Sequence, residues 1–449
     1  MARTPKKTTH ARPLFDEPVF GEGVVAPDPG HFSTRHPSDN AEYKIIEQLL
    51  YKDVVGFDKS RIAANEVYEL ATAFGSPGPQ VVQRIEKNGR IVFHALGDSG
   101  CSDVRKYSNE IRVFDQNADD VHTAAVTDRP SFLYHLGDVI YNFGESKYYY
   151  DQFYEPNRNY PGPIFAIPGN HDSFILPDTA DADFPLVTFA RNFCAESPVI
   201  TREAGSLHRT AMTQPGVYFT LDAPFVRIIG LFSNALEDPG VISSLDGQWP
   251  VVPNFQLEFL DAQIERIIDE KYKGAVLLAV HHPPFTYAPP SGGSGVGGNH
   301  GSSTDMLRRI DTILNQKGWY PHAFLAAHAH NYQRYTRTVR LGGHDLDVPF
   351  IVCGSGGHNL NPMVRASRGK PAHDPSFGSK VDYLDVEPAV STGGLILEKY
   401  NYRDYGYLRI SVDAQQLRIG FHVAQNGSLP QSRFDLVTVD LPSHTMVAN

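Results

Sequence analysis

Short runs rich in apolar residues recur along the chain from about residue 90, and most of them end at a glycine or a polar residue. Runs of about four to eight such residues, bounded by turn residues, are typical of strands buried on both faces. The runs expected to form such strands are 91–96, 131–136, 163–167, 225–232, 275–280, 323–327 and 349–352. Two further runs, 407–412 and 417–423, are expected to be closing strands.

Helical spacing occurs between these runs. Over residues 255–268 the apolar side chains repeat at intervals of three and four, which is the period of one helix face; they are Leu257, Leu260, Ile264 and Ile267. Ser303 and Thr304 can cap a second helix over 306–314. Strands alternating with helices indicate an α/β layered domain, in which ligands bind beyond the carboxyl ends of the strands.

The first 85 residues and the segment 361–403 lack the alternation of strands and helices expected in the rest of the chain. Residues 1–35 are rich in proline and charge and are expected to form a flexible arm, while the spacing over 42–74 suggests one or two helices. The Gly/Pro-rich stretch 75–79 then breaks the chain. We therefore expect an N-terminal extension over 1–85 and one large domain over 86–449. Within that domain, residues 361–403 show little apolar periodicity and are expected to be a surface excursion.

Composition narrows the class of protein. The formal net charge of −11 disfavours a broad surface for long nucleic acids. Three cysteines, Cys101, Cys194 and Cys353, without CxxC spacing suit a reducing compartment and give no disulfide framework. The sequence has neither a signal-peptide-like apolar run near Met1 nor a stretch of about 20 apolar residues. A cytoplasmic protein with no membrane partner is therefore expected.

Six polar side chains suited to binding metal ions follow five of the expected strands, at the strand end or just beyond it. Carboxylate, amide and imidazole groups are ligands for Fe, Mn and Zn, and one carboxylate can bridge two ions. Any one of these residues could instead cap a helix or form a turn, but the whole set favours a pair of neighbouring metal ions. The candidates are Asp98, Asp138, Asn170, His281, His328 and His330.

These clusters resemble the motifs of the calcineurin-like metallophosphoesterases, and within them most closely the purple-acid-phosphatase branch. The matching motifs are Asp98-Ser-Gly100, Gly137-Asp-Val-Ile-Tyr141, Gly169-Asn-His-Asp172, Val280-His281 and His328-Ala-His330, within residues 91–358. The resemblance implies a four-layer α/β/β/α sandwich, in which two mixed β-sheets pack together with helices outside. It also makes 86–449 the catalytic domain.

The resemblance implies two metal sites that share one carboxylate. The first would use Asp98, Asp138, Tyr141 and His330, and the second would use Asp138, Asn170, His281 and His328. Many relatives have a histidine where this chain has Gly100, and the purple-acid branch uses the tyrosine instead. A phenolate favours a trivalent ion, so Fe(III) is expected at the Tyr141 site and Fe, Mn or Zn at the second. Alternatively, Tyr141 packs under the sheet and water takes its place.

Other family positions are less certain in role. Relatives place the fourth ligand two residues before a proline, which selects His281 over its neighbour His282; alternation along a strand lets only one of them face the site. The usual glycine before the last motif is Ala327 here, which is tolerable unless positive φ is needed there. His282 could support the site, contact substrate or be a core residue.

Three more residues are candidates for contact with substrate or proton transfer. His171 resembles the family's phosphate-contacting or acid histidine, and Asp172 could fix its tautomer and raise its pKa; the alternative is that His171 caps a turn. His300, in the Gly-rich segment 291–303, could lie on the substrate side or in a solvent loop. His358 is expected near the rim of the site.

The implied function is hydrolysis of a phosphoric ester by a dinuclear-metal enzyme, with a metal-activated hydroxide attacking phosphorus. The ligand set does not distinguish phosphomonoesterase from phosphodiesterase activity. The acidic chain favours small organic phosphates or nucleotides as substrates. A non-catalytic, metal-containing scaffold or interaction protein is the alternative.

Overall fold

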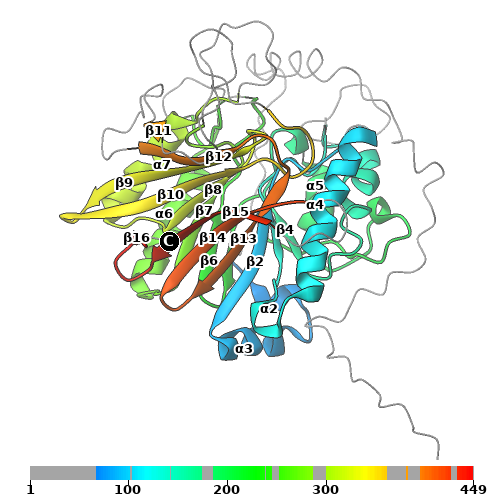
Figure 1. Ribbon diagram of the computed structural model, residues 1–449, viewed down its shortest axis with the longest axis horizontal. Coiled ribbons are helices and arrows are strands. Elements are labelled where there is room, and N and C mark those ends of the chain that lie inside the picture. The colour runs from blue at the N-terminus through cyan, green and yellow to red at the C-terminus, as the bar shows by residue number, and fades with distance from the viewer. Residues whose placement is uncertain are drawn as a thin grey trace, which may run out of the picture.

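Two mixed β-sheets form the body of the protein in the computed structural model, with helices on their outer sides (Figure 1). The structure describes residues 67–101, 104–141, 143–173, 186–237, 239–244, 252–286, 300–361, 381–382, 395–425 and 432–447. Side chains from both sheets share one buried apolar core. The predicted four-layer α/β/β/α sandwich with two mixed sheets is thereby confirmed.

The larger sheet has nine strands, and its central strands are parallel. In spatial order they are β1 (Val67–Glu69), β5 (Phe219–Ala223), β6 (Val226–Gly230), β7 (Ala275–Ala279), β8 (Ala323–Ala326), β10 (His344–Cys353), β9 (Tyr332–Leu341), β12 (Leu395–Asn401) and β11 (Val381–Asp382). Strands β6, β7, β8 and β10 run parallel to one another, while β9 and β12 continue the sheet antiparallel.

The smaller sheet has seven strands. Their order is β16 (Thr445–Val447), β15 (Ser432–Asp440), β14 (Gln416–Val423), β13 (Gly406–Asp413), β2 (Arg90–Leu96), β3 (Leu133–His135) and β4 (Ile164–Ala166). Strands β2, β3 and β4 are parallel, and the other four form an antiparallel meander beside β2. The two sheets therefore each present a block of parallel strands.

Helices connect most neighbouring parallel strands, because a parallel pair needs a long crossover. Helix α4 (Val104–Thr123) lies between β2 and β3, α6 (Phe255–Asp269) between β6 and β7, and α7 (Thr304–Lys317) between β7 and β8. With α5 (Val187–Phe193), α4 lies at one side of the molecule, and α6 and α7 lie at the other (Figure 1). Two short helices, α2 (Leu70–Ala73) and α3 (Gly78–Asn88), precede β2.

Every run expected to be a strand overlaps a strand of the structure, and the helices expected over 255–268 and 306–314 are α6 and α7. Helices were also expected over 42–74; there, residues 42–66 lie outside the described residues, Val67–Glu69 is strand β1 against the prediction, and Leu70–Ala73 is helical. The capping of α7 differs in detail from the prediction. Ser303 is the N-cap residue, but its hydroxyl makes no cap hydrogen bond and instead accepts the N–H of Gly240 at 2.9 Å. The serine thus ties the start of α7 to the loop that follows β6.

Two expectations about the chain's organisation are changed or left open. The surface excursion over 361–403 is wrong in part, because Leu395–Asn401 forms β12 and pairs with β9; residues 362–380 and 383–394 lie outside the described residues. Residues 1–66, including the expected arm over 1–35, also lie outside them. The boundary at residue 85 stays a prediction, although β1 of the extension pairs with β5 in the larger sheet.

Buried polar contacts join the two sheets. Arg334 of β9 makes a bidentate ion pair with Asp435 of β15, with Nε–Oδ2 and Nη2–Oδ1 distances of 2.7 and 3.1 Å. Tyr332 donates its hydroxyl to the same carboxylate at 2.7 Å.

All three cysteines are free. The helices in the described part of the chain lack the combination of length and apolar character needed to cross a membrane.

Candidate metal centre

The predicted ligands follow the parallel strands of both sheets. Asp98 follows β2, Asp138 follows β3 and Asn170 follows β4, while His281 follows β7 and His328 follows β8. The carboxyl ends of parallel strands point to the same edge of a sheet. Because two parallel blocks pack together, their loops meet at one place and deliver polar groups from both sheets.

Three of these residues have backbone conformations that are unusual for residues other than glycine. Asp98, Asp138 and His328 have φ values of 56°, 53° and 66°. Positive φ costs about 1–3 kcal/mol and persists where the surrounding structure enforces it, often at functional sites. Ala327 is not in this region, so its methyl group is compatible with the backbone, as expected.

Close packing of the loops explains the glycine before Asn170. A Cβ atom at Gly169 would lie 2.1 Å from Asp138 Oδ1 and 2.4 Å from the Asp138 amide nitrogen. Only glycine therefore lets the Asn170 loop approach the carboxylate of Asp138. Any larger residue at 169 would push the two candidate ligands apart.

Asp98, Tyr141 and His330 form the first cluster of donor atoms. The Tyr141 hydroxyl donates to Asp98 Oδ1 at 2.8 Å and lies 3.1 Å from His330 Nε2, which is itself 3.5 Å from Asp98 Oδ1. Burial raises the pKa of Tyr141, and the carboxylates of Asp138 and Asp98 raise it further. Its ionisation to a phenolate therefore requires a neighbouring cation.

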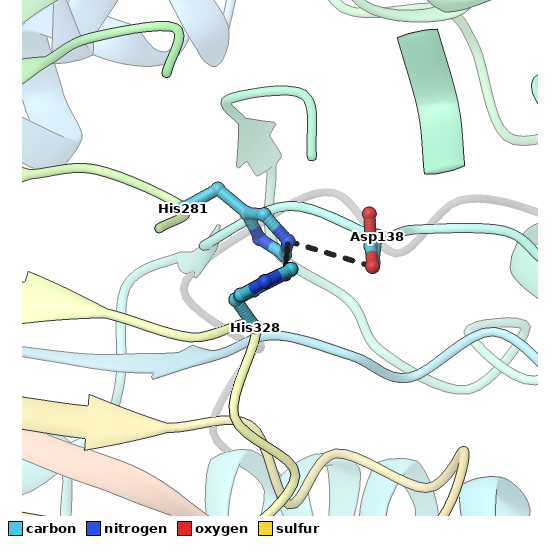
Figure 2. Close-up of side chains that lie close together, drawn as sticks. All are labelled: Asp138, His281 and His328. Carbon is cyan, nitrogen blue, oxygen red and sulfur yellow. Dashed lines mark hydrogen bonds and ion pairs between the residues drawn. The ribbon is translucent and has the colours of Figure 1, made fainter. Parts of the chain in front are cut away.

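Asp138, Asn170, His281 and His328 form the second cluster. Figure 2 shows three of them, Asp138, His281 and His328. Asn170 Oδ1 lies 3.0 Å from both His281 Nε2 and His328 Nδ1, and these two nitrogens are 3.2 Å apart. Asp138 Oδ2 lies 3.4 Å from His281 Nε2. Donor atoms of Asp138, His281 and His328 all lie within 4.8 Å of one another. The structure thus brings the side chains of each predicted group together, and the Asp138 carboxylate also interacts with Tyr141 of the first cluster; that these residues bind metal stays a prediction.

Hydrogen bonds to neighbouring groups orient both histidines of the second cluster. His281 Nδ1 lies 2.9 Å from the Leu136 carbonyl oxygen, which only accepts, so Nδ1 carries a proton and Nε2 is the ring nitrogen directed at the other candidate ligands. His328 Nε2 is 3.1 Å from His300 Nδ1. Its other ring nitrogen faces Asn170 and His281. These are the arrangements expected of metal-binding imidazoles.

The charge balance of the second cluster also suits a cation. Burial lowers the pKa of His281, but the Asp138 carboxylate outweighs burial and raises the pKa to about 9. Burial raises the pKa of Asp138, whereas His281, His171 and hydrogen bonding outweigh it and lower the pKa. Asp138 Oδ2 is buried and receives no hydrogen bond from the described residues. The donor set therefore fits the metal pair that the family motifs imply.

His171 and Asp172 lie together in a short 3-10 turn, but they do different things. The side chain of His171 is partly exposed, and its ring centroid is 4.4 Å from that of Tyr141. Asp172 is buried and accepts the backbone N–H groups of Gly169, Val139 and Ile140 at 2.9–3.2 Å. Burial and the Asp138 charge raise its pKa to about 7. Against the expectation that it orients His171, Asp172 holds two ligand-bearing loops together.

The two histidines predicted to contact substrate occupy different positions. His282 is buried, with Nδ1 2.8 Å from Ser233 Oγ and Nε2 2.7 Å from the Leu236 carbonyl, and its ring packs 4.3 Å from that of His328. These contacts favour support of His328 over contact with substrate. His300 lies beside His328 at the edge of the second cluster, as the substrate-side interpretation requires.

One carboxylate near the clusters was not anticipated. Glu237, in the loop after β6, lies with Oε2 3.4 Å from Asn170 Nδ2 and Oε1 3.6 Å from His300 Nδ1. Its side chain is 36% exposed. One feature of the sequence could have indicated Glu237: the apolar run that forms β6 ends in a polar loop, as do the runs that form its parallel neighbours.

The chain is similar to known phosphoesterases. The family model of the calcineurin-like phosphoesterases matches residues 92–332. Similar solved structures include GAP50, the anchor in the inner membrane complex of Plasmodium (11% identity, 77% of this chain and 88% of that chain covered, TM-score 0.44), and PhoD (11%, 79% and 70%, 0.45). A dimetal phosphatase from Danio rerio is another (13%, 78% and 99%, 0.42). No curated protein matches. Because the family match spans over half of the chain and all the candidate ligands, this chain belongs to the calcineurin-like phosphoesterase family.

Proposed function

We propose that this protein is a dinuclear-metal hydrolase of small phosphate esters, with a ligand set like that of the purple-acid-phosphatase branch. One observation carries the proposal: the side chains group into two clusters, and the Asp138 carboxylate interacts with Tyr141 of the first and with His281 of the second. Asp98, Tyr141 and His330 would hold one ion with Asp138. Asn170, His281 and His328 would hold the second.

Paired ions bound there would supply an activated water and neutralise charge on the phosphate oxygens. The protein's own groups would hold the ions, orient the phosphate ester and transfer protons. His171 is the proton-transfer candidate, because its ring is partly exposed beside Tyr141. His300, next to His328, is placed to contact a phosphate oxygen. Asp172 keeps the Asp138 and Asn170 loops in register.

Small organic phosphates or nucleotides are the proposed substrates. The net charge of −11 disfavours long anionic polymers. Tyr141 at the first cluster favours Fe(III) there, because a phenolate is a hard anionic donor, with Fe, Mn or Zn at the second. Monoesters are slightly favoured over diesters by this ligation. A cytoplasmic location stays a prediction, which the three free cysteines support.

Removal and return of metal tests the proposed activity. Protein treated with a chelator should lose hydrolysis of an aryl phosphate monoester, and iron with manganese or zinc should restore it, because the reaction needs the ion pair. A bis-aryl phosphate diester assayed beside the monoester gives the preference between them. Protein that holds two ions but turns over neither ester contradicts the proposal and favours the non-catalytic scaffold interpretation.

Tyr141→Phe tests the first cluster optically. Iron-loaded wild-type protein should show a visible phenolate-to-iron charge-transfer band, and the variant should lack it because the donor oxygen is gone. The ring itself stays, so its contacts with His171 and His358 are retained. Tyr332→Phe, which removes a buried hydroxyl at the sheet junction, is the matched control and should keep the band. A band that survives in Tyr141→Phe rules out this tyrosine as the ligand.

A further inference from the structure

His358, in the loop after β10, packs directly on the ring of Tyr141. The two ring centroids are 3.5 Å apart, and the planes meet at 15°, so the rings are stacked. Both side chains are buried, with exposed fractions of 4% for His358 and 1% for Tyr141. On the ring of Tyr141, His171 makes a second contact, with a centroid distance of 4.4 Å and a tilt of 41°. The phenol ring is thus confined by two imidazoles.

His358 is itself fixed to the loop that carries Asp98. Its backbone N–H donates to the Asp98 carbonyl oxygen at 3.0 Å. Its Nδ1 lies 2.6 Å from the Gly100 carbonyl oxygen, which only accepts, so Nδ1–H is the donor. His358 is thus bonded to the loop of Asp98 while its ring stacks on Tyr141, so one residue connects two candidate ligands of the first cluster.

The loop from Gly354 to His358 has little room to move. Gly356 N–H donates to the Gly97 carbonyl oxygen at 3.1 Å, and a Cβ atom at Gly356 would lie 2.4 Å from that same oxygen. Gly357 has a φ of +150°, and a Cβ atom there would lie 2.6 Å from the Cα atom of Glu110 on α4. The imidazole of His358 is therefore held on a rigid support, as groups that orient metal ligands usually are.

We propose that His358 is a positioning residue that sets the plane of the Tyr141 ring, and with it the direction in which the lone pairs of the phenol oxygen face the first metal site. The inference rests on the proposed role of Tyr141 as a ligand. Rotation about the Cβ–Cγ bond leaves the phenol oxygen on the rotation axis but turns the ring plane, so a freely rotating ring would present the oxygen's lone pairs to the ion in no fixed direction. Stacking against a fixed imidazole removes that rotational freedom before an ion binds.

The experiment compares iron-loaded variants by visible absorption and by iron retention against a chelator. His358→Leu fills similar space without an aromatic face, and the charge-transfer band should shift and weaken while iron retention falls about 10- to 100-fold. His358→Phe keeps a stacking ring but loses the Gly100 bond, so its shift should be smaller. His422→Phe is the control, because His422 stacks on Tyr407 with a centroid distance of 5.8 Å in the smaller sheet, outside both clusters.

The outcomes separate the inference from the function on which it rests. A wild-type-like band and retention in His358→Leu overturn the inference and leave Tyr141 as a ligand. Absence of a band in iron-loaded wild-type protein overturns both. Thermal unfolding identifies a variant that has lost its fold. If His358→Leu does not fold, His358→Phe decides: a shifted band supports the inference, and an unchanged band with unchanged retention overturns it.

Discussion

Replacing Asp138 with asparagine should lower turnover of a phosphate ester by at least about 10³-fold, the largest effect expected of any single change in this chain. The amide keeps the size of the carboxylate but removes the negative charge that both clusters share. Asp138 Oδ2 receives no hydrogen bond from the described residues and lies 3.4 Å from His281 Nε2. Its loss should also lower metal content below two ions per chain.

The control for Asp138→Asn is Asp120→Asn, which changes another buried carboxylate. Asp120 pairs with His94 at 2.8 Å and with Arg409 at 2.7 Å, and none of these residues belongs to the metal clusters. That variant should lose stability while keeping two ions and turnover per folded molecule. Turnover of Asp138→Asn within a factor of about ten of wild type would contradict a bridging role.

Replacing His171 with alanine should lower turnover by about 10²- to 10⁴-fold, the range expected for loss of a proton-transfer group. Metal content should stay near that of the wild type, because residue 171 contacts Asp138 through its backbone N–H and the Tyr141 ring keeps its stack with His358 when the His171 ring is removed. That N–H donates to Asp138 Oδ1 at 3.0 Å, and alanine retains it. Metal analysis and steady-state kinetics on the same preparation measure both quantities.

His282→Asn is a useful comparison for His171→Ala. His282 is a buried neighbour of the clusters with both ring nitrogens hydrogen-bonded to protein groups. Its loss should weaken metal binding through His328, whereas loss of His171 should spare it. Unchanged turnover in His171→Ala, or a loss of metal large enough to explain the loss of activity, would contradict the proton-transfer role.

The convergence of the ligands could be predicted from sequence because it follows from strand direction. Apolar runs ending at Asp98, Asp138 and His281 are parallel strands, and parallel strands place their carboxyl ends at one edge. The chain order of these short motifs then indicated the family. The division into two clusters came from the resemblance, and the structure groups the side chains in the same way.

Other features could not be predicted, because the sequence pattern is silent about side-chain direction. Asp172 could equally have faced His171 or the backbone, and the structure shows its oxygens on three amides. Glu237 and His358 follow parallel strands but belong to no matched motif. His358 was expected at the rim of the site, whereas it is buried and stacks on Tyr141, and no motif linked Glu237 to Asn170. Strand β12 was missed because its apolar run, Leu395–Leu397, has only three residues and is followed by the charged pair Glu398 and Lys399.

The most direct test of the account is anomalous X-ray diffraction from crystals of the iron- and manganese-loaded protein, which locates each ion independently of any activity. The account requires two ions per chain, one among Asp98, Tyr141 and His330 and the other among Asn170, His281 and His328, with the Asp138 carboxylate in contact with both. A single ion, or two ions with Asp138 bound to only one of them, would contradict it.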